Sequence, residues 1–300
     1  MKVKEYREAW RVSLHGGHSG QFCDHAEGSL LDILQAANAK GYHTFGVTEH
    51  MPRTQAYIYP EEAAMGWTAE YLQQLFDAYI LELNRLQQEF SGQMHILRGF
   101  EAEVVPPDSW LPWVQNLRSA RLAGNQPAFD YLVGSVHFVN GFQIDGSLQA
   151  WQLAVEEHGG TEPLAIAYYN MLEEMVTTLR PEVTGHFDLI KKNPMRHNLE
   201  ADKLHAPAVR KASTRALQAV KEAGSILDLN LAGWRKKLGE PYPSPELVQE
   251  ASAMRIPFCF GDDSHRPSEA GENLDKGREY LLSLGVNTIS SLNQTTISLL

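Results

Sequence analysis

Short apolar runs alternate with amphipathic stretches along most of the chain. Apolar runs of four to eight residues are typical of buried parallel strands, and apolar positions spaced three and four apart are typical of covering helices. The predicted strands occupy residues 12–14, 43–48, 95–101, 130–136, 183–187, 225–230 and 256–261. The predicted helices occupy residues 27–40, 68–90, 110–122, 162–179, 201–223, 245–254 and 268–284. Seven alternating units predict a parallel sheet with helical crossovers.

This alternation favours an α/β fold in one domain, a distorted (β/α)7 TIM-like barrel spanning residues 1–300. A doubly wound open sheet is the alternative. Two segments fall outside the pattern. The polar, glycine-containing segment 140–160 is predicted to be an inserted loop or short helix, and residues 286–300 are predicted to add a final short strand and cap.

Composition places the chain among ordinary globular proteins, with 43% apolar and 21% charged residues. Its two cysteines, Cys23 and Cys259, form no CxxC pair and favour a reduced, cytoplasmic protein, with Cys23 predicted as a small buried residue. We find no signal-peptide pattern and no apolar run of membrane-spanning length. The net charge of −11 argues against a broad nucleic-acid surface but suits a protein that binds divalent metals and a small anionic substrate. The sequence leaves a homo-oligomer open.

Histidines and acidic residues gather just after the predicted strands. Because the carboxyl ends of barrel strands meet at one rim, we expect these side chains to lie together. Imidazole and carboxylate groups suit Zn²⁺, Mn²⁺ or Fe²⁺. Nine such groups exceed the needs of one tetrahedral ion, so they predict two or three divalent metal ions, an arrangement that can activate water against a phosphoester. The predicted metal ligands are His15, His18, His25, His50, Glu101, His137, His186, Asp263 and His265.

These motifs resemble those of the PHP (polymerase and histidinol phosphatase) superfamily of metallophosphoesterases, in particular its monofunctional histidinol-phosphatase branch. The similarity extends from His15 to about Gly271. The matching motifs are the His15/His18 loop with His25, Thr48-Glu49-His50, Gly-Phe-Glu ending at Glu101, Gly-Ser-Val-His ending at His137, Gly-His-Phe-Asp with His186, and Asp262-Asp263-Ser264-His265. The resemblance implies a distorted barrel of seven units around the metal cluster, with Glu101 as a bridging ligand. The first motif differs, because it is His-x-x-His where the family usually has His-x-His.

The resemblance also implies a metal-dependent phosphomonoesterase that hydrolyses L-histidinol phosphate to L-histidinol and phosphate in histidine biosynthesis. We assign catalytic roles to Glu101, Asp263 and His265, with His265 as a candidate proton donor to the leaving group.

Cations outside the metal shell are needed to bind the phosphate. Arg53 and Arg235 are the first candidates, because a guanidinium can donate two parallel hydrogen bonds to phosphate, and Lys191, Lys192 and Arg266 are weaker candidates. The ammonium and imidazole of such a substrate need acidic or aromatic partners, and the acidic candidates are Glu49, Glu103 and Asp188. Glu103 and Asp188 are also candidates for holding ligand histidines by hydrogen bonds.

Three other functions are considered. One is a phosphoesterase of the same fold that acts on a nucleotide or sugar phosphate. A second is a non-catalytic, metal-stabilised module, which the nine intact ligand positions argue against. A third is an amidohydrolase-like barrel, which usually carries a carboxylated lysine at a strand end, and no lysine occupies such a place in the ligand pattern here.

Overall fold

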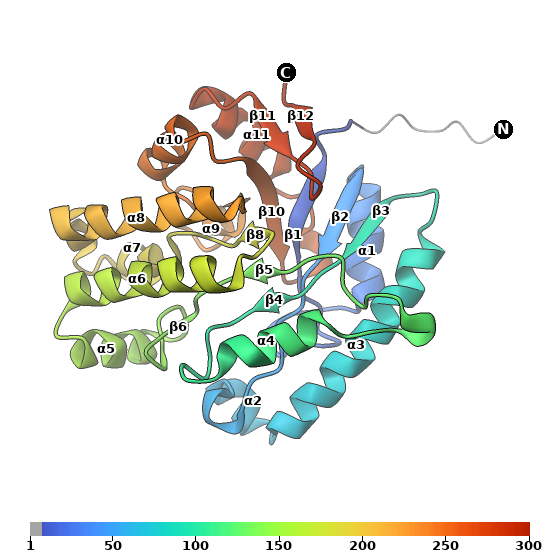
Figure 1. The fold of residues 1–300 in the computed structure, drawn as a ribbon, viewed down its shortest axis with the longest axis horizontal. Helices are drawn as coiled ribbons and strands as arrows, with labels where there is room; N and C mark the ends of the chain where they lie inside the picture. The colour runs from blue at the N-terminus through green and yellow to red at the C-terminus, as the bar shows by residue number, and fades with distance from the viewer. Residues whose placement is uncertain (1–7) are drawn as a thin grey trace.

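The computed structural model describes residues 8–300, in which parallel strands form a curled sheet surrounded by helices (Figure 1). The sheet has eight strands in the order β3-β2-β1-β10-β9-β8-β5-β4, and all neighbours are parallel. The strands are β1 (Val12–Gly17), β2 (Thr44–Val47), β3 (His95–Arg98), β4 (Glu101–Ala102), β5 (Val133–Gly134), β8 (Val183–Thr184), β9 (Ile226–Asn230) and β10 (Phe258–Ser264). Each falls within or overlaps a predicted strand.

The two ends of this strand order meet in one continuous piece of chain. β3 and β4 stand at opposite ends of the order, yet only Gly99 and Phe100 separate them in sequence. Beyond β2, His50 forms a parallel bridge with Glu101, which joins the two edges. The predicted third strand is therefore split, and the split lets the sheet close on itself. The distorted TIM-like barrel is confirmed, and the open-sheet alternative is wrong.

All seven predicted helices are present, and all except α6 are shorter than their sequence pattern suggested. They are α1 (Leu30–Ala39), α3 (Ala69–Glu89), α4 (Trp110–Arg118), α6 (Thr161–Leu179), α8 (Pro207–Ala223), α10 (Pro245–Ala253) and α11 (Leu274–Ser283). Capping explains the difference at α1, where Ser29 and Asp32 form a reciprocal capping box and so fix the start at Leu30. In Figure 1, α6 and α8 lie side by side on one flank of the sheet, whereas α3 and α4 lie on another.

The regions predicted as loops contain additional short elements. Residues 49–67 contain η1 (Gln55–Tyr57) and α2 (Pro60–Ala64), and the tail forms an antiparallel pair, β11 (Thr288–Ser290) with β12 (Thr296–Ser298). The predicted insertion 140–160 begins within the hairpin of β6 (Phe138–Val139) and β7 (Phe142–Gln143) and also contains α5 (Leu148–Glu157). The remaining short helices are η2 (Ala123–Asn125), η3 (Leu189–Lys191), α7 (Lys192–His197), η4 (Ala201–His205), α9 (Ala232–Arg235) and η5 (Pro267–Glu269). Helices of three to six residues are too short to produce a readable periodicity.

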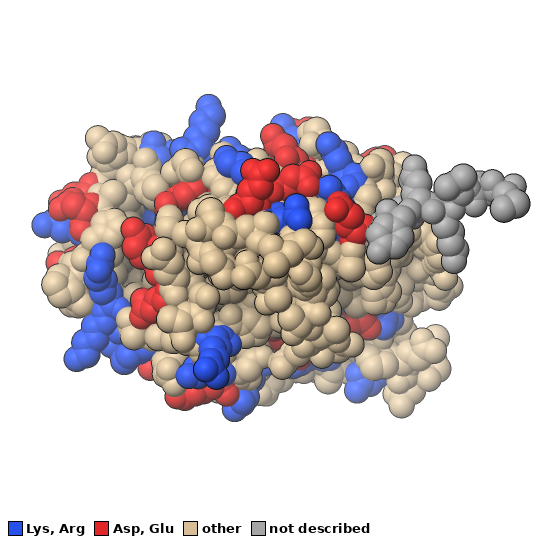
Figure 2. Space-filling view, turned by 90° about the horizontal axis from the view of Figure 1, so that it is seen from above, with Lys and Arg blue, Asp and Glu red and all other residues tan. Residues whose placement is uncertain are grey.

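The surface carries both signs of charge. On the face shown in Figure 2, acidic and basic side chains are interspersed, and neither forms a continuous area. A helix long and apolar enough to cross a bilayer is absent from the described part of the chain.

Candidate metal centre

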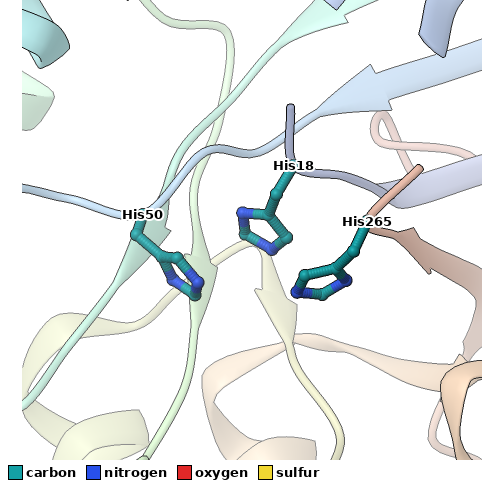
Figure 3. A group of neighbouring side chains, drawn as sticks. All are labelled: His18, His50 and His265. Carbon is teal, nitrogen blue, oxygen red and sulfur yellow. The ribbon is translucent and has the colours of Figure 1, made fainter. Parts of the chain in front are cut away.

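The structure brings all nine predicted metal ligands together at the carboxyl ends of the strands. Their potential ligand atoms form overlapping groups of three, with the atoms of each group within 4.8 Å of one another. The groups are His18/His50/His265, His15/His18/Glu101, Glu101/His137/His186, His15/His186/Asp263 and Cys23/His25/His50. Figure 3 shows the first group, in which three rings from separate segments converge. These residues, far apart in sequence, share one site because β2, β1 and β10 are adjacent parallel strands.

Glu101 lies at the centre of this arrangement and is almost fully buried. Its Oε1 lies 3.6, 3.8 and 3.0 Å from the Nε2 atoms of His15, His137 and His186 respectively. Its Oε2 lies 3.6 Å from His18 Nε2 and 3.0 Å from His50 Nδ1. Each oxygen of the carboxylate therefore faces a different set of imidazoles.

Several ring nitrogens in the cluster are buried without a hydrogen-bond partner. Within residues 8–300 they are His15 Nε2, His18 Nδ1, His186 Nδ1 and His50 Nδ1, the last of which lies near Glu101 but outside hydrogen-bond geometry. An unsatisfied buried polar atom costs about 1–3 kcal/mol, so such atoms are rare unless something else binds them. Nitrogen and oxygen donors at this spacing match what divalent transition metals require. The residues present therefore fit divalent metal ions.

An irregular pairing between β1 and β10 accommodates the additional glycine of the first motif. β1 pairs with β10 through Ser13–Phe260, His15–Gly261 and Gly17–Ser264, so the register shifts twice within five residues of β1. Gly17 has a φ of 152°, and a Cβ there would lie 2.2 Å from the Ser264 carbonyl oxygen. This irregular pairing keeps both His15 and His18 buried and within the cluster despite the His-x-x-His spacing.

A second layer of carboxylates orients the histidines. Asp228 Oδ2 lies 2.9 Å from His15 Nδ1, which leaves Nε2 directed at Glu101. Glu103 contacts His137 Nδ1 in the same way, as predicted from its position. Such partners fix the tautomer and raise the basicity of a ligand imidazole. The sequence analysis missed Asp228, although an acidic residue near the end of the predicted strand 225–230 is a usable signal.

Glu49 holds the first-motif loop. Its Oε1 accepts hydrogen bonds from the backbone N (2.7 Å) and Oγ (2.8 Å) of Ser19, and its Oε2 lies 3.4 Å from His18 Nδ1. It is therefore engaged with the protein rather than directed at the cavity.

The buried charges of the cluster favour cations. Burial opposes protonation of His15, but Glu101 and Asp228 outweigh it and raise the pKa of His15 to about 9. For His137, burial is likewise outweighed by Glu103 and Glu101, and the pKa rises to about 10. Burial would raise the pKa of Glu101, yet the surrounding histidines hold it well below its usual value. The carboxylates therefore create a strong local demand for positive charge.

Arg53, one of the two first candidates for binding phosphate, is buried beside α2. It donates a hydrogen bond to Glu62 at 2.5 Å and lies 3.9 Å over the Tyr59 ring. It does not line the cavity above the cluster. The reason is local, since Glu62 reaches back from a short helix that the sequence pattern did not reveal.

Arg235 and Lys191 also make internal contacts instead of lining the cavity. Arg235 donates to the carbonyl oxygens of Asp262 and Asp263, and thereby braces the strand end that carries Asp263. Lys191 Nζ lies 2.7 Å from a Glu240 oxygen and 2.9 Å from an Asp188 oxygen. Phosphate binding by these cations stays a prediction that their contacts do not favour.

A cavity of about 360 Å³ opens over the cluster and includes six of the predicted ligand histidines together with Glu101 and Asp263. The other residues that line it are Asp24, Tyr59, Glu61, Gln143, Asp145, Gly146, Ser147, Leu189, Lys192, Ala232, Lys236 and Tyr242. Among the lysines and arginines of residues 8–300, Lys192 and Lys236 are the ones that reach this wall. Burial and the nearby Lys192 lower the pKa of Lys236.

Cys23 and the histidines outside the predicted ligand set differ in their positions relative to the cluster. Cys23 is buried as predicted, but it also lies in a potential ligand group, with Sγ 3.2 Å from His25 Nδ1. Within the described residues, none of the five histidines without a strand-end position joins a ligand group; these are His43, His95, His158, His197 and His205.

Comparison with known proteins agrees with this geometry. The chain is 34% identical over 285 residues to the Schizosaccharomyces pombe protein named "Probable histidinol-phosphatase", covering 94% of this chain and 90% of that protein. A solved structure from Listeria monocytogenes matches with a TM-score of 0.74 at 23% identity, covering 88% of this chain and 99% of that one. A Lactococcus lactis histidinol phosphate phosphatase, solved with zinc, L-histidinol and phosphate, matches with a TM-score of 0.66 at 17% identity, covering 97% of each chain.

At these identities the two solved structures establish the shared fold. The sequence model described as "PHP domain" matches residues 14–232, which include seven of the nine predicted ligands. This match covers well over half of the chain. The protein therefore belongs to the PHP domain family.

Proposed function

We propose that this protein is a metal-dependent phosphomonoesterase that hydrolyses L-histidinol phosphate to L-histidinol and phosphate, a reaction of histidine biosynthesis. The observation that carries the proposal is the arrangement around Glu101, whose two oxygens face separate groups of histidines beneath an open cavity. The activity named for the S. pombe relative, which aligns over nearly the whole chain, supports the choice of substrate.

Two or three divalent ions, Zn²⁺, Mn²⁺ or Fe²⁺, are the proposed cofactors, held by the nine ligands of the cluster. When bound, such ions supply an activated water and stabilise the charge of the phosphoryl and leaving oxygens. Glu101 is the proposed bridge between ligand sets. Asp263 Oδ1 lies 3.6 Å from His18 Nε2, so these two residues would share an ion.

His265 is the proposed proton donor to the leaving alkoxide. It lines the cavity, and its Nδ1 lies 3.1 Å from the Asp263 carbonyl oxygen. That contact would hold the proton on Nδ1 in the neutral ring and leave Nε2 to serve either a metal or the leaving group. Lys192 and Lys236, which line the same cavity, are the proposed cationic contacts of the phosphate.

The test is release of inorganic phosphate by protein reconstituted with each metal, measured over a panel of phosphomonoesters. We expect L-histidinol phosphate to be the best substrate and His186→Ala to lose both turnover and bound metal. A preference for a nucleotide or sugar phosphate would replace this substrate with the alternative from the same fold. No turnover of any ester by protein with full metal content would favour a non-catalytic module. Cytoplasmic location and a homo-oligomer stay predictions.

A further inference from the structure

One wall of the cavity comes from the insertion that follows β5. This segment contains β6, β7 and α5, and it contributes Gln143, Asp145, Gly146 and Ser147 to the cavity lining. The sequence pattern predicted no catalytic or binding residue in this segment. The insertion therefore reaches the reaction chamber without supplying any member of the metal-ligand groups.

Asp145 is the charged residue of this wall, and its two carboxylate oxygens have different surroundings. Lys192 Nζ donates to the Asp145 backbone carbonyl at 2.5 Å and lies 3.3 Å from Oδ2. Oδ1 is buried and has no hydrogen-bond partner within residues 8–300. Lys192 thus fixes the carboxylate while leaving Oδ1 unsatisfied, an arrangement that is costly unless a donor occupies it.

The other acids available to a substrate are already engaged. Glu49, Glu103 and Asp188, the acids suggested by the sequence, do not line the cavity. Among the acids that do line it, Glu101 and Asp263 belong to the metal-ligand groups, and Asp24 lies 2.9 Å from His25 Nδ1. Glu61 is exposed to solvent. Asp145 is the remaining acid of this cavity: its side chain is 17% exposed, and its Oδ1 is unpaired among the described residues.

We propose that Asp145 Oδ1 binds the ammonium group of the substrate and so selects phosphate esters that carry a protonated amine close to the ester oxygen. This inference rests on the proposed function. In L-histidinol phosphate the amine is on the carbon next to the one that bears the ester oxygen, so phosphate at the cluster places the ammonium near the cluster's rim. Asp145 shares the cavity with the ligands His137 and His186, which is the position such an anchor requires.

The experiment compares two substrates in two variants. Asp145→Asn keeps the shape and the backbone contact to Lys192 but removes the charge. Glu61→Gln is the matched control, because it removes one charge from the same cavity at an exposed position. Each protein is assayed with L-histidinol phosphate and with p-nitrophenyl phosphate, which has no amine, and its metal content is measured.

We expect Asp145→Asn to lower kcat/KM for L-histidinol phosphate roughly 10- to 100-fold, as the loss of a charged hydrogen bond predicts. Activity on p-nitrophenyl phosphate and inhibition by inorganic phosphate should change far less, because Lys192, the proposed phosphate contact, keeps its hydrogen bond to the Asp145 carbonyl oxygen. Metal content should stay as in the wild type, whereas inhibition by L-histidinol should weaken. Glu61→Gln should leave all of these unchanged.

An equal loss on both substrates, or no loss on either, would overturn the inference. Activity on p-nitrophenyl phosphate also reports whether the variant folds, and Asp145→Ser serves as a second variant if Asp145→Asn does not. Failure of the proposed function gives a different result, because the wild type would then show no preference for L-histidinol phosphate. If the wild type prefers L-histidinol phosphate and Asp145→Asn keeps that preference, the role of Asp145 is refuted while the proposed function stands.

Discussion

Asp228 offers a sharp test of how the metal centre is built, because it touches a predicted ligand without lining the cavity. Its Oδ2 lies 2.9 Å from His15 Nδ1 and accepts hydrogen bonds from the His186 backbone N at 3.3 Å and from Asn230 Nδ2 at 3.0 Å. The side chain is fully buried. Asp228→Asn keeps its volume but removes the charge that holds the proton on His15 Nδ1.

The expected cost follows from that contact. Removing a carboxylate that orients a ligand histidine typically weakens metal binding 10- to 100-fold. This corresponds to roughly 1.4 to 2.7 kcal/mol of binding free energy. Since the substitution is nearly isosteric, we expect little change in the far-ultraviolet circular dichroism of the metal-free protein.

The assay is a competition titration of Zn²⁺ between the metal-free protein and a chromophoric chelator. We expect one binding step to weaken in Asp228→Asn and activity to recover when excess metal is supplied. Asp77→Asn is the matched control, because Asp77 is exposed on α3 and accepts a hydrogen bond from Gln73. Unchanged Zn²⁺ affinity in Asp228→Asn, with or without loss of activity, would refute the orienting role.

Three further outcomes are expected. Removing the metals with a chelator should lower the Tm by roughly 5 to 10 °C, since ions at 100 times their Kd contribute about 2.7 kcal/mol. Differential scanning fluorimetry should show this shift and its reversal when metal is added back, and an unchanged Tm would contradict the prediction. Arg53→Met should lower the unfolding free energy, measured by urea titration, by about 3–5 kcal/mol, because it leaves Glu62 buried and unpaired. KM for the phosphate ester should stay constant. A raised KM at unchanged stability would instead show that Arg53 binds the phosphate. Arg235→Met should reduce metal content and Tm together, since it frees the carbonyl groups beside Asp263, and an effect confined to KM would contradict this bracing role.

The barrel and the gathering of the nine candidate ligands at one rim were predictable because both depend on local pattern. Strand and helix periods are visible over a few residues, and parallel strands place every strand end on one rim. A histidine directly after a strand, such as His137 or His186, is therefore located by topology alone. The same reasoning missed the split between β3 and β4, because closure depends on the curl of the whole sheet.

The cations around the site were not predictable in the same way. The sequence cannot show whether an arginine forms an ion pair within the protein. Arg53 pairs with Glu62, nine residues further along the chain in a helix of one turn. Arg235 is occupied by carbonyl groups of a strand 27 residues away. Asp145 was missed because its importance comes from one unsatisfied oxygen, which only the packed structure reveals.

The central claim, that Glu101 bridges a cluster of metals that hydrolyses a phosphate ester, is tested most directly by crystallography of the protein grown with Zn²⁺ and phosphate. Anomalous difference maps should contain two or three metal peaks among the nine ligands, two of them sharing Glu101 through its separate oxygens, with phosphate bound to them. A single ion, or ions bound away from Glu101, would contradict it.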